Sequence, residues 1–172
     1  MRPRAACGGL TMDKTRLAIG LVFIAAIGSG IVAGIFFAFS SFVMTALGKI
    51  SPAQAVAAMN SINVTVINPG FMTAFMGTGV LCLVIGVESP FLWNHTGAGL
   101  AFLASLVYLL GCFGATMVLN VPLNNQLASI ADPAAAIAFW PEYLKTWTMW
   151  NHLRTIAAAL SAVLFTVALC RS

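Results

Sequence analysis

Four long runs of apolar residues dominate the chain, and shorter stretches in which polar side chains gather separate them. The runs cover residues 17–47, 71–87, 97–119 and 150–169. A helix rises 1.5 Å per residue, so about 20 residues cross a hydrocarbon core of about 30 Å. The pattern therefore predicts an all-α fold, an integral membrane four-helix bundle.

The first long connection carries the signals of a short helix. Ser51 precedes Pro52 and Gln54, and serine at the N-cap, proline at N1 and glutamine at N3 form a strong helix start. The helix is predicted to run to about Val66. It is short and only mildly apolar, so we expect it to lie in or near the membrane interface. The Asn-Pro-Gly sequence at 68–70 then opens the second span.

The second long connection begins with the motif Asn-Val-Pro-Leu-Asn-Asn at 120–125. We expect loop residues after this motif, and then a second short interfacial helix over 134–140 that starts at Asp132-Pro133. Tyr143 and Lys145 would lead from that helix into the fourth span, as solvated side chains.

Composition supports the membrane class. Hydrophobic residues make up 60% of the 172-residue chain and charged residues only 7%, whereas soluble domains carry about 25% charged residues. So few charges cannot cover a surface that faces water. The four cysteines form no C-x-x-C pair, which argues against a zinc site or a disulfide framework. Nothing in the charge of +4 suggests a nucleic-acid partner.

The basic residues predict the orientation in the membrane. Arg2, Arg4, Lys14 and Arg16 precede the first span, and Arg171 follows the last. The positive-inside rule then places both termini in the cytoplasm, with both long connections outside a cell inner membrane. We divide the chain into a disordered N-terminal extension, residues 1–16, and a membrane domain, residues 17–171. The first eleven residues look unlike the rest, and a misplaced start codon is an alternative explanation.

Gly30 and Gly34 form a G-x-x-x-G pattern in the first span. Small residues at this spacing let two helices approach closely. They are either the contact surface of a homo-oligomer or ordinary glycines of a membrane helix.

Metal and cofactor sites find no support in the sequence. Under the predicted topology His95 and His152 lie on opposite sides of the membrane, so they cannot share a metal ion or a haem. The four acidic residues are split in the same way. There is also no glycine-rich phosphate loop, no dinucleotide fingerprint and no G-x-S-x-G nucleophile motif. We therefore expect no cofactor.

The most informative stretch is the start of the fourth span. Arg154 lies about one helical turn inside an apolar run, where a charge is costly. Trp147, Trp150, Asn151 and Arg154 fall at i, i+3, i+4 and i+7, so on a helix they form one polar and aromatic stripe. His152 points to a different face.

The predicted topology brings further amides to the same, outer half of the bundle. They are Asn60, Asn63, Asn68, Asn120 and Asn124. Amides and a guanidinium suit an oxyanion or enolate where water is scarce, and His152 is a candidate base. The expected partner is a flat, apolar, weakly acidic aromatic molecule whose oxygen Arg154 and Asn151 hold, while the asparagines and Trp150 orient it.

Each of these residues also has a simpler explanation. Arg154 extends toward the interface or bridges loop carbonyls. Asn68 and Asn120 cap helices, Asn124 ties down its own loop, and His152 lies on the surface. Trp140, Trp147 and Trp150 would then form an aromatic belt.

Five short motifs together resemble one family. They are Phe36-Phe37-Ala38-Phe39-Ser40 with Met44 and Leu47, Ala58-Met59-Asn60-x-x-Asn63, Asn68-Pro69, Asn120-Val121-Pro122-Leu123-Asn124, and Trp150-Asn151-His152-x-Arg154-Thr155. In this order, over residues 17–170, they resemble the anthrone oxygenase-like membrane proteins, which are largely a domain of unknown function.

The resemblance implies a four-span frame and an oxidoreductase activity. A few fungal members are linked to the oxidation of anthrones to anthraquinones by molecular oxygen, without metal or flavin. The sequence thus favours a cofactor-independent membrane oxygenase that acts on an anthrone-like, phenolic or quinone-like lipophile. The alternative is a non-enzymatic membrane protein that binds a lipid, a quinone or a partner subunit.

Overall fold

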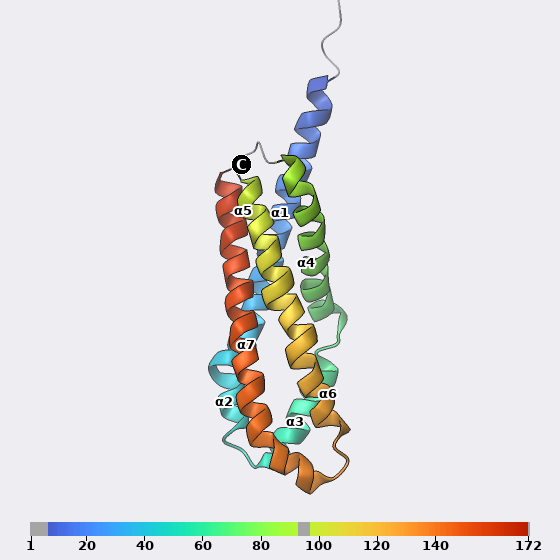
Figure 1. The fold of residues 1–172 in the computed structure, drawn as a ribbon, viewed down its shortest axis with the longest axis vertical. Helices are drawn as coiled ribbons and strands as arrows, with labels where there is room; N and C mark the ends of the chain where they lie inside the picture. Colours follow the sequence, from blue (N-terminus) through green and yellow to red (C-terminus); the bar gives the residue numbers. More distant parts are fainter. Residues whose placement is uncertain (1–6, 93–96, 172) are drawn as a thin grey trace, which may run out of the picture.

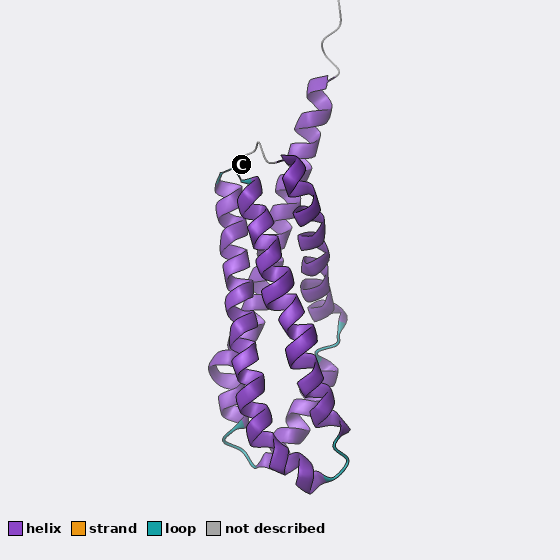
Figure 2. Ribbon diagram, viewed as in Figure 1, coloured by secondary structure: helices purple, strands orange, loops and turns teal. Residues whose placement is uncertain are grey.

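The computed structural model describes residues 7–92 and 97–171, and these residues form a bundle of four antiparallel helical rods (Figure 1). Helices make up nearly all of the described chain, which contains no strand (Figure 2). Every rod is long and apolar enough to cross a membrane, over Arg16–Leu47, Pro69–Phe91, Ala98–Ser129 and Pro133–Cys170. The predicted four-helix membrane bundle is confirmed.

The rods are built from the following elements. The first is α1 (Cys7–Ala38), a π-helical stretch η1 (Phe39–Val43) and α2 (Met44–Leu47); the second is α4 (Pro69–Glu88), followed by a 3₁₀ turn (Ser89–Leu92). The third is α5 (Ala98–Leu106), two π-helical stretches η3 (Val107–Gly114) and η4 (Thr116–Asn120), and α6 (Val121–Ser129). The fourth is α7 (Pro133–Cys170), and α3 (Pro52–Thr65) lies in the first connection.

Small side chains let the rods pack closely along the bundle axis. α1 packs against α7 and α4, and the third rod packs against the same two helices. Ala25, Ala104 and Ala158 are fully buried at these contacts, as expected for helices that associate without water. Large apolar side chains such as Phe37 face outward, where only lipid would cover them.

The two ends of the bundle differ. α2, α3, α6 and the first turns of α7 gather at one end, which we name the loop end, while the C-terminus and the start of α1 lie at the other (Figure 1). The loop end has its own apolar core, which includes Met44, Met59, Leu127, Trp140 and Tyr143. Which side of the membrane the loop end faces stays a prediction.

Helix α3 begins and ends close to the predicted residues. Ser51 caps it by accepting a hydrogen bond from the Gln54 amide, and its hydroxyl also contacts the Gln54 side chain at 2.8 Å. Its location at a membrane interface stays an expectation.

The second connection is shorter than the sequence suggested. Residues 120–125 belong to a continuous rod that ends at Ser129, because Pro122 stands in the first turn of α6, where a proline is tolerated. The helix expected over 134–140 is the beginning of α7, which continues through Pro141. Burial of Trp140 and Tyr143 on either side of this proline outweighs the lost backbone hydrogen bond.

The described residues bear on the prediction for the N-terminal stretch and only in part on the turn between the second and third spans. Helix α1 begins at Cys7, so part of the stretch 1–16, for which we expected disorder, is helical. Residues 1–6 lie outside the described residues, as do Trp93 and His95.

Gly30 and Gly34 face away from the bundle. A Cβ atom at either position would meet nothing within 4 Å, whereas one at Gly28 would collide with Thr78. The homo-oligomer through Gly30 and Gly34 stays a prediction, and the close contacts inside the bundle depend on other glycines.

One of these contacts supplies a test of the packing. A Cβ at Gly111 would lie 2.7 Å from the Cβ of Ala157 on α7, and an alanine Cβ cannot move without its backbone. We expect Gly111→Ala to cost about 1–3 kcal/mol through overpacking. Gly77→Ala, where nothing lies within 4 Å, should be neutral or stabilising because alanine favours helix. Thermal unfolding in mild detergent measures both, and equal melting temperatures would contradict the close approach of the third rod to α7.

Candidate functional site

Arg154 is the one buried cation among the side chains that the structure places, and it lies near the middle of α7. About 24 Å of helix separate it from Cys170, and about 32 Å from Pro133. Its exposed fraction is only 5%. The guanidinium lies between two aromatic rings, with its central carbon 4.1 Å from the centroid of Phe36 and 4.6 Å from that of Trp147. The predicted intramembrane charge is thus enclosed by α1 and α7.

Asn151 fixes the orientation of this guanidinium. The Arg154 Nε donates a 2.9 Å hydrogen bond to Asn151 Oδ1. The Asn151 Nδ2 in turn donates to the Phe36 carbonyl at 2.8 Å and to the Ser40 hydroxyl at 2.6 Å. The amide therefore joins α7 to α1, and both of its ends are used.

No carboxylate accompanies the arginine. Glu88, Asp132 and Glu142 are all exposed, and within the described part of the chain only Asn151 accepts a hydrogen bond from Arg154. A buried cation whose neighbours are amides, hydroxyls and aromatic faces has its charge spread but not neutralised. Such a site attracts an anion.

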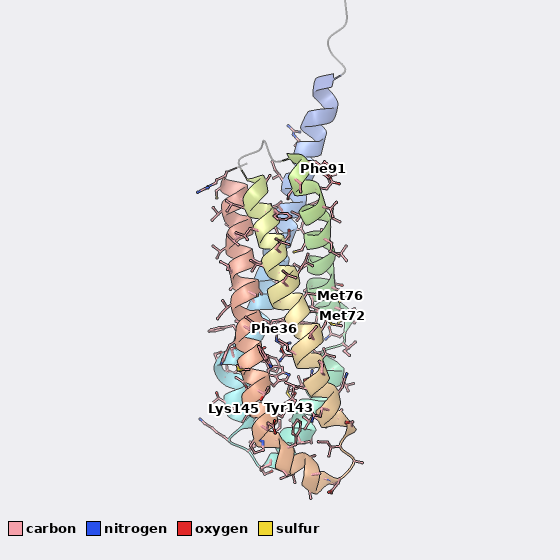
Figure 3. The ribbon with its side chains drawn as sticks, viewed as in Figure 1. Phe36, Met72, Met76, Phe91, Tyr143 and Lys145 are labelled. Carbon is pink, nitrogen blue, oxygen red and sulfur yellow. The ribbon has the colours of Figure 1, made fainter. Side chains whose placement is uncertain are left out.

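A second amide, Asn124 of α6, organises the side of the site nearer the loop end. Its Oδ1 accepts two hydrogen bonds, from the Tyr143 hydroxyl and from the Trp147 Nε1, both at 2.8 Å. Tyr143 is fully buried and stacks on Trp140. Figure 3 shows Phe36 and Tyr143 within the bundle, whereas Lys145 points away from it. Asn124 therefore holds the indole that covers the guanidinium.

Four buried polar atoms of the described residues have no hydrogen-bond partner: Asn60 Oδ1, Asn63 Nδ2, Asn120 Oδ1 and Thr148 Oγ1. Asn120 is fully buried, and its Nδ2 donates to the Trp147 carbonyl. Asn63 lies beside the Tyr143 hydroxyl. Buried polar groups are normally paired, so these atoms mark positions at which water or a ligand group supplies the missing bonds.

Departures from regular α-helix coincide with the site. η1 contains Ser40, which contacts both Asn151 and Thr155 of α7. η4 ends at Asn120, whose amide donates to the Trp147 carbonyl, and η3 contains Gly111, which closely approaches Ala157 of α7. π-helical turns are rare and are frequent at functional sites, so both rods that face α7 here depart from the α-helix next to the arginine.

Not every predicted site residue joins this cluster. Arg154, Asn151, Asn120 and Asn124 are brought together. Asn60 and Asn63 lie on α3, and Asn63 lies beside the Tyr143 hydroxyl. Asn68 is exposed and caps α4, accepting from the Phe71 amide at 3.1 Å. His152 is exposed on another face of α7, and Trp150 is half-buried without a ring contact to the arginine.

Several residues of the site were missed. Tyr143 is buried, not solvated. Trp147, which the predicted stripe included, contacts the guanidinium, so the alternative of an aromatic belt is wrong for this residue. Phe36, Ser40 and Thr155 belong to the motifs of the family resemblance, but the helical pattern alone did not assign them to the site. Residues 143, 147, 151 and 154 share one helical face, and reading α7 as unbroken through Pro141 would have extended the stripe to Tyr143.

These observations define a class of protein: a four-span membrane bundle with a buried, uncompensated guanidinium among amides. A family model described as anthrone oxygenase matches residues 71–164, more than half of the chain. The chain belongs to the anthrone oxygenase family. No curated protein and no solved structure matches it. Among the described residues, no group of three or more His, Cys, Asp or Glu could hold a metal ion.

Asn124 offers a test of this architecture. Asn124→Leu removes the acceptor of two buried donors, Tyr143 and Trp147, and each unpaired donor costs about 1–3 kcal/mol. We therefore expect a clear loss of stability in thermal unfolding. The neighbouring Asn125 is exposed, so Asn125→Leu should leave the melting temperature unchanged. If the two variants melt alike, Asn124 does not hold the two rings.

Proposed function

We propose that this protein is a membrane oxygenase that oxidises an activated ring carbon of an anthrone-like lipophile with molecular oxygen. The observation that carries the proposal is the buried Arg154 guanidinium, stacked between Phe36 and Trp147, held by Asn151 and free of any carboxylate among the described residues. Family membership supports the same reaction class.

The chemistry follows from what an anthrone needs. Its carbonyl makes the opposite ring carbon acidic, and loss of a proton gives an anion whose charge rests mainly on oxygen. Arg154 would stabilise that oxyanion in a site with few competing waters, where preorganised donors are most effective. The anion carries an electron pair on carbon that oxygen can accept, so the substrate itself supplies the reducing equivalents. The proposal therefore keeps the expectation that neither metal nor flavin takes part.

Asn151 and the remaining amides have supporting roles in this proposal. Asn151 aims the guanidinium, while the unpaired atoms of Asn60, Asn63 and Asn120 would orient the polar edge of the substrate. The apolar rings of the site fit a flat aromatic molecule that enters from the lipid. We further propose the cell inner membrane as the location, with both termini cytoplasmic, since the basic residues of the sequence favour it.

His152 and Asn68 are not part of the proposed machinery. His152 lies on an exposed face of α7 and Asn68 serves as an exposed helix cap. In this proposal the substrate proton passes to a water held at one of the unpaired amide atoms, and from there to solvent.

Arg154→Met tests the proposal directly. Methionine has a similar length and replaces a buried charge by an apolar group, which proteins often tolerate. We expect the variant to fold but to form anthraquinone from anthrone at least about 100-fold more slowly, since loss of one oxyanion donor has effects of this size. The assay follows oxygen uptake and quinone formation in lipid vesicles, above the autoxidation of protein-free vesicles. With ¹⁸O₂, the new carbonyl should carry the label.

Lys145→Met is the matched control, because it removes an exposed cation from the same helix. It should keep the wild-type rate. A folded Arg154→Met variant with the wild-type rate would refute the role of the guanidinium. Wild-type protein that copurifies with a lipophile yet consumes no oxygen with anthrone would favour the non-enzymatic alternative, a lipid- or quinone-binding protein.

His152→Gln separates the exposed histidine from the buried cluster. We expect its rate of quinone formation to stay within about twofold of wild type, because the side chain does not reach the site. A general base typically contributes about 10²–10⁴-fold, so a loss of that size in the same vesicle assay would restore His152 as the base.

A further inference from the structure

One titratable hydroxyl in the site has no function in the mechanism described so far. Tyr143 is fully buried, on the same face of α7 as Trp147 and Arg154. Its hydroxyl donates to Asn124 Oδ1 at 2.8 Å, and that oxygen also holds the Trp147 indole that covers the guanidinium. The phenol is therefore attached to the same framework as the arginine.

The surroundings of this hydroxyl suit a group that both gives and takes a proton. The Tyr143 hydroxyl donates its proton to Asn124 Oδ1, so the lone pairs of the Tyr143 oxygen remain available to accept a hydrogen bond. The amide nitrogen of Asn63 lies beside it and lacks a hydrogen-bond acceptor. Burial disfavours a phenolate at this position, whereas an unused donor beside the hydroxyl and a guanidinium on the same helical face both favour it.

We propose that Tyr143 is the acid–base catalytic residue that converts the peroxide of the oxygenated substrate into the quinone. This inference rests on the proposed function, since it assigns a further residue to the same reaction. It also explains how a site without a buried carboxylate or histidine among the described residues can complete the reaction.

The steps balance as follows. The substrate CH₂ group loses one proton to solvent, and the resulting carbanion gives its electron pair to O₂ as the C–O bond forms. This yields a peroxide anion, which takes the Tyr143 proton to give the hydroperoxide. The Tyr143 phenolate then removes the remaining hydrogen of that carbon as a proton. As the C–H electrons form the carbonyl, the O–O bond breaks and hydroxide leaves. The released proton and hydroxide make water, so one anthrone and one O₂ give one anthraquinone and one water.

Tyr143→Phe keeps the ring that stacks on Trp140 and removes only the hydroxyl. In vesicles with anthrone and oxygen, we expect quinone formation to fall at least about 100-fold, while oxygen addition continues and a benzylic hydroperoxide is released. Trapping with a phosphine, which reduces the hydroperoxide to an alcohol, detects it by mass spectrometry. A purely structural hydroxyl would lower the amount of active protein without changing the product.

Tyr108→Phe is the control, because it also removes a fully buried hydroxyl, one whose hydrogen bond goes to the Phe75 carbonyl and not to an asparagine. It should form quinone at the wild-type rate and release no hydroperoxide. Should Tyr143→Phe fold poorly, 3-fluorotyrosine at position 143 keeps the hydrogen bond but makes the phenol more acidic. It should change both the rate and the solvent isotope effect of quinone formation.

The outcomes separate this inference from the proposed function. Wild-type activity together with unchanged rate and product in Tyr143→Phe, or an unchanged isotope effect with 3-fluorotyrosine, overturns the role of Tyr143 alone. Wild-type protein that forms no quinone from anthrone overturns the proposed function and this role with it.

Discussion

A nearly fully buried guanidinium requires the rest of the bundle to compensate for the water it has lost. A charge inside a membrane helix is costly, by about 2.5–3.5 kcal/mol at the helix centre on insertion scales and more in simulations. Two aromatic faces, at 4.1 and 4.6 Å, and the bond to Asn151 offset part of this cost. These groups come from two different rods, so the charge can be stabilised only when α1 and α7 are packed together.

The same requirement accounts for the irregular backbone of the rods around Arg154. Asn151 reaches the carbonyl of Phe36 and the hydroxyl of Ser40, and the π-helical stretch η1 begins between these two residues. A π-helical turn departs from the regular α-helical hydrogen-bond pattern, which makes backbone groups available to side chains. The third rod shows the same departure opposite Arg154, ending at Asn120, whose amide bonds the Trp147 carbonyl. The local geometry of the helices is thus fitted to the polar cluster between them.

The sequence predicts the bundle well because long apolar runs and capping residues are local signals. Ser51 and Asn68 cap helices where their side chains indicated. The stripe of Trp147, Asn151 and Arg154 was also local, at helical spacing. What could not be predicted were partners distant in the chain, such as Phe36 on α1 and Asn124 on α6. The signal of Pro122 misled, because this proline stands in the first turn of α6. Helix α7 also continues through Pro141, where burial of the neighbouring aromatic rings outweighs the usual effect of a proline on a helix.

The choice of amides over carboxylates around Arg154 has a functional consequence. An aspartate at position 151 would form an ion pair with the arginine and cancel the charge that attracts an anion. Asparagine instead aims the guanidinium and leaves its charge available. The same holds for Asn124, which orients Trp147 and Tyr143 without adding a charge. In the proposed function, a neutral framework around one cation would let the site favour the anionic form of a bound lipophile over its neutral form, and this preference would make a weakly acidic ring carbon reactive toward oxygen.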